Sequence, residues 1–138
     1  MSPQFPIGKS ISLIYRQNQK RLAQAFKPYG LGGGGHHSFL KTIVLHPGIR
    51  QDRLTADLKF DKATTARAVQ HLEREGYIER RPDDSDRRSH RLYPTQKGAD
   101  FMPRLNRVLS DFNAELTQNL DEEEQKQLVA LLQKIYRP

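Results

Sequence analysis

The sequence contains no cysteine and no long apolar run. The absence of cysteine excludes disulfide bonds and a thiol-based sensor. No segment approaches the roughly 18 consecutive apolar residues that a membrane-spanning helix needs. Residues 1–6 also lack the charged start and apolar core of a secretory signal. A mean hydropathy of −0.79, with 36% hydrophobic residues, is typical of a soluble chain with a polar surface. We therefore expect a cytoplasmic protein.

Acidic residues are scarce in the amino-terminal part of the chain. Residues 1–49 carry six Lys or Arg and no acid, residues 50–98 carry twelve against nine, and residues 99–138 carry five against seven. The formal net charge of +7 favours a polyanionic partner for the first two thirds. An acidic membrane surface would require an amphipathic helix with basic residues on one face, and residues 9–27 match that only in part. We expect no membrane partner.

Motifs of catalysis are also absent. The sequence has no glycine-rich phosphate loop after a strand and no nucleophile elbow. The acidic run at residues 121–124 lies at a predicted helix start, where interaction with the helix dipole accounts for it. These features indicate a protein that is not an enzyme and that carries no cofactor.

The most informative segment is a helix predicted from residue 61 to residue 76. Asp61 is suited to accept hydrogen bonds from the first turn, and Gly76 is suited to the left-handed residue that ends a helix. The spacing of Thr65, Ala68, Val69 and Leu72 predicts a buried face. The polar residues then lie on the other faces of the helix. Arginine pairs with guanine and glutamine with adenine, so Arg67 and Gln70 are candidates for reading bases, and Thr64 and Lys62 for contacting the backbone. By itself this pattern favours an ordinary surface helix with a solvated polar face.

A charged hairpin follows this helix. Residues 77–81 have strand-forming composition, residues 82–86 form a turn, and residues 87–93 return as a second strand. The hairpin carries five arginines. Arginine at a hairpin tip can enter a narrow minor groove, and Asp84 and Asp86 are suited to orient those guanidiniums. Because the hairpin directly follows the candidate recognition helix, the two together indicate a winged helix that binds duplex DNA.

Further helices are predicted on both sides. The apolar spacing predicts helices over residues 7–26, 36–46 and 51–58, with a flexible joint at Leu31 and the glycines 32–35 between the first two. A long helix from about residue 96 and a last helix from residue 121 carry more apolar positions than one small winged helix can cover. We infer a mainly α fold with a small β-hairpin wing, in which the first, fifth and sixth helices pack against a second chain. The alternative is a monomer in which these helices cover their own core.

The sequence resembles the MarR family of regulators from residue 7 to residue 136. The most specific portion runs from Asp61 to Arg80, followed by Asp86-Arg87-Arg88, Leu92, Thr95 and Gly98. The resemblance implies one MarR-type domain over residues 1–138, with dimerisation helices at 7–30 and 99–138 and a winged helix-turn-helix lobe at 36–98. It also implies a homodimeric, ligand-responsive repressor that binds double-stranded DNA at a pseudo-palindromic operator. Release is expected from a small aromatic or phenolic, often anionic, effector bound between the lobes.

The resemblance also assigns individual residues. Asp86 and Arg88 match the wing pair in which a carboxylate holds an arginine for the minor groove, and Arg87 is the neighbouring cation. With the residues of the predicted helix, the DNA-binding candidates are Lys62, Thr64, Arg67, Gln70, His71, Asp86, Arg87 and Arg88. Two positions depart from the family pattern. Pro94 stands where a leucine is usual and removes a backbone donor at the strand end, and Ala66 stands where many members have a hydroxyl.

The effector site is the least specific part of the prediction. The ligand-binding candidates, which could frame an aromatic anion, are Tyr15, Arg16, His36, His37 and Phe39. A zinc-responsive regulator of the same fold is an alternative, but His36 and His37 are adjacent and point apart, and no Cys or Glu cluster stands with them, so no metal site is assigned. A winged helix that binds RNA or protein instead of duplex DNA is a further alternative.

Overall fold

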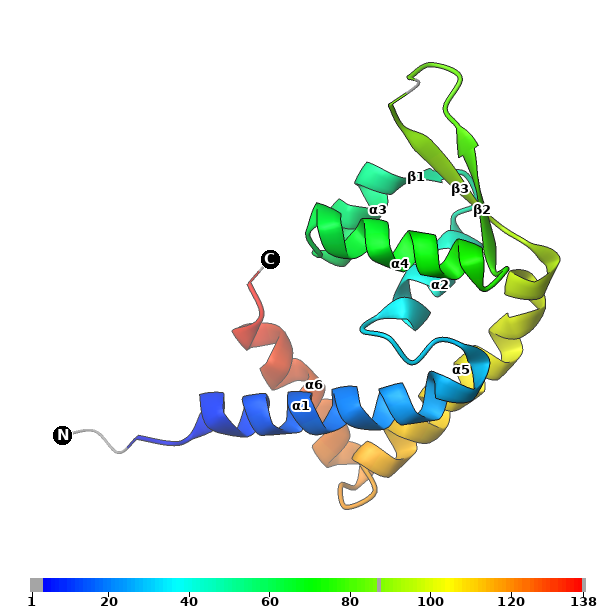
Figure 1. Ribbon diagram of the computed structural model, residues 1–138. Helices are drawn as coiled ribbons and strands as arrows, with labels where there is room; N and C mark the ends of the chain where they lie inside the picture. Colours follow the sequence, from blue (N-terminus) through cyan, green and yellow to red (C-terminus); the bar gives the residue numbers. More distant parts are fainter. Residues whose placement is uncertain (1–3, 87, 138) are drawn as a thin grey trace. The chain divides into compact units, whose positions relative to one another are not determined.

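The structure is a computed structural model, and it describes residues 4–86 and 88–137. Over these residues the chain forms six α-helices, one 3-10 helix and one three-stranded sheet (Figure 1). The elements are α1 (Ile7–Phe26), η1 (Lys27–Tyr29), α2 (His36–Leu45), β1 (Ile49–Arg50), α3 (Gln51–Leu58), α4 (Lys62–Arg74), β2 (Ile78–Pro82), β3 (His90–Pro94), α5 (Gln96–Leu116) and α6 (Glu122–Ile135). This architecture confirms the predicted mainly α fold with a hairpin wing. The chain divides into two compact units, Met1–Leu105 and Asn106–Pro138, because most contacts between residues lie within one unit or the other.

Helices α3 and α4 form the helix-turn-helix of the first unit. Lys59 adopts a left-handed conformation with φ of 60° and ends α3. Asp61 then caps α4, because its carboxylate accepts a hydrogen bond of 2.6 Å from the backbone N–H of Thr64. At the other end, Gly76 has φ of 82°, and the N–H of Tyr77 donates back to the carbonyl of Leu72. Both predicted ends of this helix are confirmed.

The core of the first unit lies where α2, α3 and α4 meet the sheet. The apolar residues that bury their side chains there are Phe26, Leu31, Phe39, Leu40, Ile43, Leu54, Ala68, Val69, Leu72, Tyr77, Ile78, Leu92 and Leu105. The four residues of α4 that were predicted to face inward are the four that are buried. Leu31 was predicted to belong to a flexible joint, but it is 1% exposed and its N–H donates to the carbonyl of Phe26. The reason is Gly30, whose φ of 75° turns the chain back against the core.

The sheet has the strand order β1-β3-β2 and is antiparallel throughout. The wing, defined as residues 78–94, differs from the prediction because its second strand begins at His90 rather than Arg87. Asp83, Asp86 and Ser89 are joined instead by turn hydrogen bonds, such as the one from the N–H of Ser89 to the carbonyl of Asp86. Pro94, which lacks a backbone donor, does not disrupt the pairing of β2 with β3, since it lies opposite Ile78 at the end of the ladder. Strand β1 was not predicted because two residues show no alternation.

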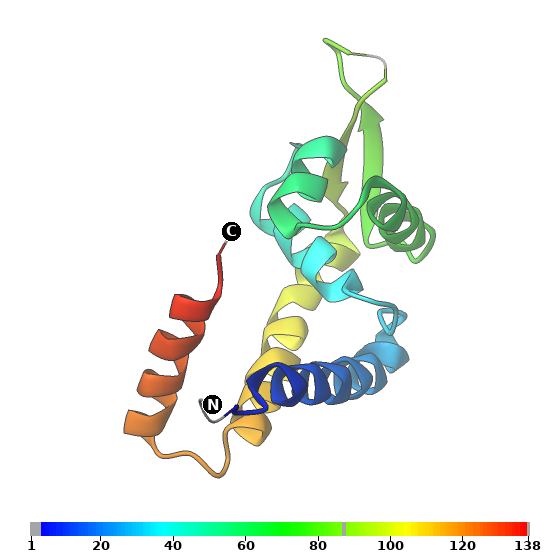
Figure 2. The same ribbon diagram turned by 90° about the vertical axis from the view of Figure 1, so that its left-hand side faces the viewer.

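Figure 2 looks nearly along α4 and shows the wing projecting beyond α3 and α4. The wing is joined to α4 at its base, where Arg80 of β2 donates to the carboxylate of Glu73 at 3.2 and 3.0 Å. The position of the hairpin beside the helix is therefore set by side chains as well as by the short connection at Gly76.

The second unit contains the end of α5 and all of α6. The carboxylate of Asp121 accepts from the N–H of Glu124, whose own carboxylate accepts from the N–H of Asp121, so a capping box starts α6. Over its described length α6 buries none of its residues, and the large apolar side chains from Leu128 to Ile135 are 41–56% exposed. In the first unit, α1 likewise buries only Phe26. None of the helices in the described residues is both long and apolar enough to span a membrane.

Candidate nucleic-acid interface

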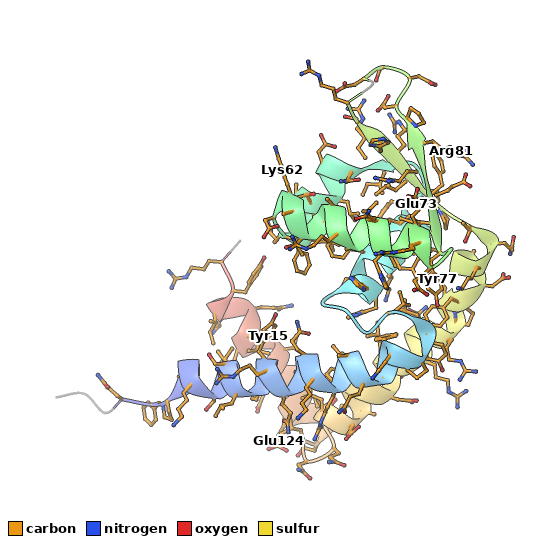
Figure 3. The ribbon with its side chains drawn as sticks, viewed as in Figure 1. Tyr15, Lys62, Glu73, Tyr77, Arg81 and Glu124 are labelled. Carbon is orange, nitrogen blue, oxygen red and sulfur yellow. The ribbon has the colours of Figure 1, made fainter. Side chains whose placement is uncertain are left out.

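The outer side of α4 is polar and accessible. We call it the recognition face and define it as Lys62, Ala63, Thr64, Ala66, Arg67 and Gln70, all of which are exposed except the partly exposed Thr64. Arg67 donates to the Thr64 hydroxyl at 3.3 Å, which holds its guanidinium along the helix. Figure 3 shows Lys62 at the first turn of α4 and Glu73 near the last, beside the wing. The helix thus presents hydrogen-bonding side chains on the side opposite its buried face.

The start of α4 carries a fixed negative charge. The hydrogen bond from the backbone N–H of Thr64, followed by one with its hydroxyl, lowers the pKa of the Asp61 carboxyl below its ordinary value. The carboxylate therefore stays ionised at neutral pH and keeps the first turn capped. Lys62 follows it directly, so the capping carboxylate and this exposed cation lie side by side at the start of the recognition face.

A hollow of about 330 Å³ separates the recognition face from the wing. Its lining consists of Gln51, Asp52, Thr55, Lys62, Ala66, Arg88, Ser89 and His90. The hollow therefore brings together two predicted site residues, Lys62 from α4 and Arg88 from the wing. The side-chain oxygen of Gln51 is buried and has no hydrogen-bond partner within the described residues. The sequence prediction missed Gln51, Asp52, Thr55 and Ser89, because no periodicity marks polar residues that meet only through the fold.

The wing arginines differ in what they contact. Arg80 pairs with Glu73 of α4, and Arg81 pairs with Glu79 and lies 4.2 Å from the centre of the Tyr93 ring. Arg91 donates to the carbonyl of Gly48 at 2.9 Å and forms an ion pair with Asp83. Arg88 is exposed, and its guanidinium has no protein partner in the part of the chain that the structure describes. Arg87 lies outside the described residues.

Asp86 of the wing acts differently from the prediction. The Asp86 carboxylate accepts from the backbone N–H of Arg88 at 2.9 Å and from the hydroxyl of Ser89, not from the guanidinium of Arg88. Asp86 therefore shapes the turn, as short acidic side chains commonly do. Asp83, which was not singled out, is 3% exposed and lies 2.7 Å from Nε of Arg50. The sequence could not show that Asp83 is buried, because it lies in a short acidic segment that is expected to be exposed.

His71 was a candidate for contacting DNA, and the structure argues against that role. Its Nε2 lies 2.6 Å from the carbonyl oxygen of Gly30, and its ring stacks on that of His36 with centroids 4.5 Å apart. His71 therefore joins α4 to the segment after α1 instead of extending the recognition face. Burial, followed by the charges of His71 and His37, lowers the pKa of His36.

The five ligand-binding candidates do not form one site. Phe39 is fully buried in the core, and Tyr15 is 61% exposed, where its hydroxyl accepts a hydrogen bond from Gln19 of the same helix. His37 stacks on Phe26 at 4.8 Å, and burial, followed by the charge of Lys41, lowers its pKa. A cavity of about 330 Å³ lies beside it, lined by Gln19, Lys20, Leu22, Ala23, Leu31, Gly32, Gly33, Gly34, Gly35 and His37. Of the candidates, only His37 contributes to this cavity.

The glycine run has a packing role on one side of this cavity. A Cβ at Gly32 would lie 3.1 Å from the carbonyl oxygen of Ala23, and one at Gly33 would overlap the ring of His36. A side chain at either position would require its neighbour to shift, so close packing favours glycine at both. The prediction of a flexible joint missed this because the packing partners lie on α1 and α2.

This winged helix closely resembles solved structures. The MarR transcriptional regulator from Methanosarcina mazei Go1 superposes with a TM-score of 0.85 over 94% of this chain and 92% of that chain, with 37% sequence identity. The MarR family model matches residues 35–90, which run from α2 to the start of β3. The chain belongs to the MarR family. The HTH-type transcriptional regulator YybA of Bacillus subtilis is 33% identical over 101 residues, which cover 73% of this chain and 67% of YybA.

A further similar structure from the MarR family contains nucleic acid. A mutant MarR from E. coli, complexed with operator DNA, superposes with a TM-score of 0.86 at 25% identity and covers 96% of this chain and 95% of that chain. The recognition face and all residues that line the hollow lie within residues 35–90, which the MarR family model matches. The wing lies within this range except for its last four residues. Among the described residues, no group of three or more His, Cys, Asp or Glu could hold a metal ion.

Proposed function

We propose that this MarR-family protein is a repressor that binds duplex DNA in a sequence-specific manner as a homodimer. The observation that carries the proposal is the hollow shared by α4 and the wing, with Lys62 on one side and, on the other, Arg88, whose guanidinium has no partner among the described residues. The recognition face of α4 is accessible to a ligand. The excess of basic over acidic residues in this part of the chain favours a polyanionic partner. The E. coli relative bound to operator DNA supports the same reading.

The recognition face is suited to the major groove. Arg67 and Gln70 project from the middle of α4, where they can reach base edges, and Arg can make a bidentate pair with guanine. Lys62 and Thr64 lie at the first turn and are suited to phosphate oxygens, which set the register without reading sequence. Arg88 at the far side of the hollow is suited to the adjacent minor groove.

Two apolar stripes support the homodimer. On α1, Ile7, Ile11 and Ile14 share one side of the helix and are 43–55% exposed, and on α6 the stripe from Leu128 to Ile135 is similarly open. Exposed apolar stripes of this size on a helix normally mark an interface. A twofold dimer would present two copies of α4 to half-sites about 34–36 Å apart. Sedimentation velocity at micromolar concentration tests this, and a single-chain species would contradict it.

Selection of bound duplexes from a random library tests sequence-specific binding directly. With the selected duplex, log Kd against log salt should have a slope of about 0.9 per phosphate neutralised. A reporter gene behind the selected sequence tests repression. Failure to enrich any duplex, or preferential binding of single-stranded RNA, would refute the proposal and favour the other winged-helix function.

Substitution of Arg67 tests base reading. Arg67→Ala should cost about 1–3 kcal/mol at one position of each half-site and relax the preference there. Lys126→Ala, which removes an exposed cation of α6 that pairs with Glu122, is the charge-matched control and should change little. A uniform loss over all duplexes would instead identify Arg67 as a phosphate contact.

Substitution of Arg88 tests the wing. Arg88→Ala should weaken binding about tenfold, or about 1.4 kcal/mol, as expected for one charged hydrogen bond, and lower the salt slope by about one. Arg81→Ala is the matched control on the same hairpin, because Arg81 is already paired with Glu79 and Tyr93. Equal losses from the two variants would contradict the assignment of Arg88.

We further propose release of DNA by a small aromatic anion, and the cavity beside the glycine run favours it. Lys20 supplies a positive charge, and His37 supplies a ring, in a cavity of about 330 Å³. Benzoate and phenol are suitable probes, because they differ in charge at neutral pH. Benzoate should displace the duplex from the native protein and less so from Lys20→Ala, whereas Tyr15→Ala should behave as the native protein. Equal displacement of all three would place the effector elsewhere.

A further inference from the structure

The base of the wing carries an unusual row of like charges. In the sheet register, Arg50 of β1 lies opposite Arg91 of β3, and Arg91 lies opposite Arg81 of β2. Like charges directly opposite each other destabilise a strand pair. Arg81 is neutralised by Glu79, so the pair formed by Arg50 and Arg91 requires a second acid.

Asp83 supplies that acid. Its Oδ2 lies 2.7 Å from Nε of Arg50 and 3.3 Å from Nε of Arg91, so one carboxylate forms ion pairs with both guanidiniums. Its Oδ1 accepts from the backbone N–H of Ser85 at 2.9 Å and from the hydroxyl at 2.8 Å. We call Asp83, Ser85, Arg50 and Arg91 the Asp83 cluster. The side chain of Asp83 is 2% exposed, whereas those of the two arginines are 39% and 41% exposed.

The Asp83 cluster joins three segments that are far apart in the sequence. Arg50 immediately precedes α3 and also donates to the Ser85 hydroxyl at 3.1 Å. Arg91 belongs to the wing and donates to the carbonyl of Gly48, in the loop after α2, at 2.9 Å. Asp83 itself begins the wing turn, five positions before Arg88. The start of the helix-turn-helix and the turn of the wing are therefore held by one carboxylate.

We infer that Asp83 is a positioning residue that sets the angle of the wing relative to the helix-turn-helix and so places Arg88 for the minor groove. This inference depends on the proposed DNA-binding function. The Ser85 hydrogen bonds, with the two arginines adding to them, hold the pKa of Asp83 at about 2, so the carboxylate is charged at any physiological pH. Without that charge, Arg50 and Arg91 repel each other, and the wing turn loses its ion pairs with both, while the strand ladder and the Arg80–Glu73 pair at the base of the wing remain.

A double-mutant cycle in DNA binding tests the inference. Asp83→Asn keeps the size and the acceptor for Ser85 but removes the charge. It should lose as much affinity for the selected duplex as Arg88→Ala, and the double variant should be no weaker than Arg88→Ala alone. Asp100→Asn, at an exposed acid of α5 whose acceptor for Gln96 is likewise kept, is the matched control and should bind as the native protein. Unchanged affinity of Asp83→Asn, or a loss that adds to that of Arg88→Ala, would overturn the inference.

Two further measurements distinguish a failure of the inference from a general loss of folding and from a failure of the proposed function. Arg91→Gln in the Asp83→Asn background removes the repulsion and should restore affinity, which no general destabilisation predicts. Amide hydrogen exchange at Leu92 and Tyr93 needs no DNA and should accelerate in Asp83→Asn. If the native protein binds no duplex, the proposed function fails, while unchanged exchange at these amides would refute the inference by itself.

Discussion

Gly98 offers a sharp test of how α5 packs against the base of the wing. Gly98 is buried in the first turns of α5. A Cβ added there would lie 2.2 Å from the carbonyl oxygen of Tyr77 and 3.5 Å from Cδ1 of Leu40. That carbonyl also accepts the N–H of Thr95 at 3.0 Å, so it has no freedom to move away without losing a hydrogen bond.

Two effects of opposite sign act in Gly98→Ala. Alanine is favoured over glycine inside a helix by about 1 kcal/mol. Overpacking a well-filled site costs about 1–3 kcal/mol, and the upper end applies because the obstructing atom belongs to the backbone. The overlap therefore dominates, and we expect a net loss of about 2 kcal/mol in the free energy of unfolding.

Urea unfolding followed by far-UV circular dichroism measures this loss. For a slope of about 2 kcal/mol per molar urea, the midpoint of Gly98→Ala should fall by about 1 M. Gly8→Ala is the matched control, since Gly8 also lies in a helix but a Cβ added there would have nothing within 4 Å. Both variants are compared at one protein concentration, because dimerisation shifts the midpoint. An unchanged or higher midpoint for Gly98→Ala would show that the helix term outweighs the overlap.

Two further predictions concern a helix cap and a histidine. Asp121→Ala removes the capping box of α6 and should cost about 1 kcal/mol of stability, measured by urea unfolding, whereas Glu123→Ala should cost less; equal losses would contradict the cap. Because burial lowers the pKa of His36 in the folded protein, the unfolded chain takes up the proton first as pH falls below about 6.5. Stability is therefore complete above that pH and declines below it, so the urea midpoint should be lower at pH 5.5 than at pH 7.5. His36→Gln should reduce this difference and His46→Gln, on an exposed residue, should not; equal differences would refute the assignment.

The helices could be predicted because their signals are local. The cap at Asp61, the stop at Gly76 and the four buried positions of α4 depend on spacing within one helix, and each appears in the structure as predicted. The same holds for α3, whose bounds match the prediction. Local rules of this kind need no knowledge of the partner surface, because backbone geometry alone decides which side chains share a face.

The wing shows where local signals end. Strand composition predicted a hairpin, but the second strand was placed three residues too early, since arginines 87 and 88 carry no mark that separates strand from turn. The basic character of the wing was apparent from its composition. The sequence did not show which arginine lacks a partner among the described residues, because Arg80, Arg81 and Arg91 contact Glu73, Tyr93 and Asp83, which only the fold brings close to them.

The amino-acid sequence by itself determined the order of the helices, the ends of α4 and the basic side of the chain, because these follow from periodicity, capping and charge. Only the tertiary structure decided that Asp83 is buried against Arg50, and that His71 faces Gly30 rather than a groove. The physical reason is distance along the chain. Both contacts join residues more than 30 positions apart, and their energy depends on burial and on neighbours that no local pattern specifies.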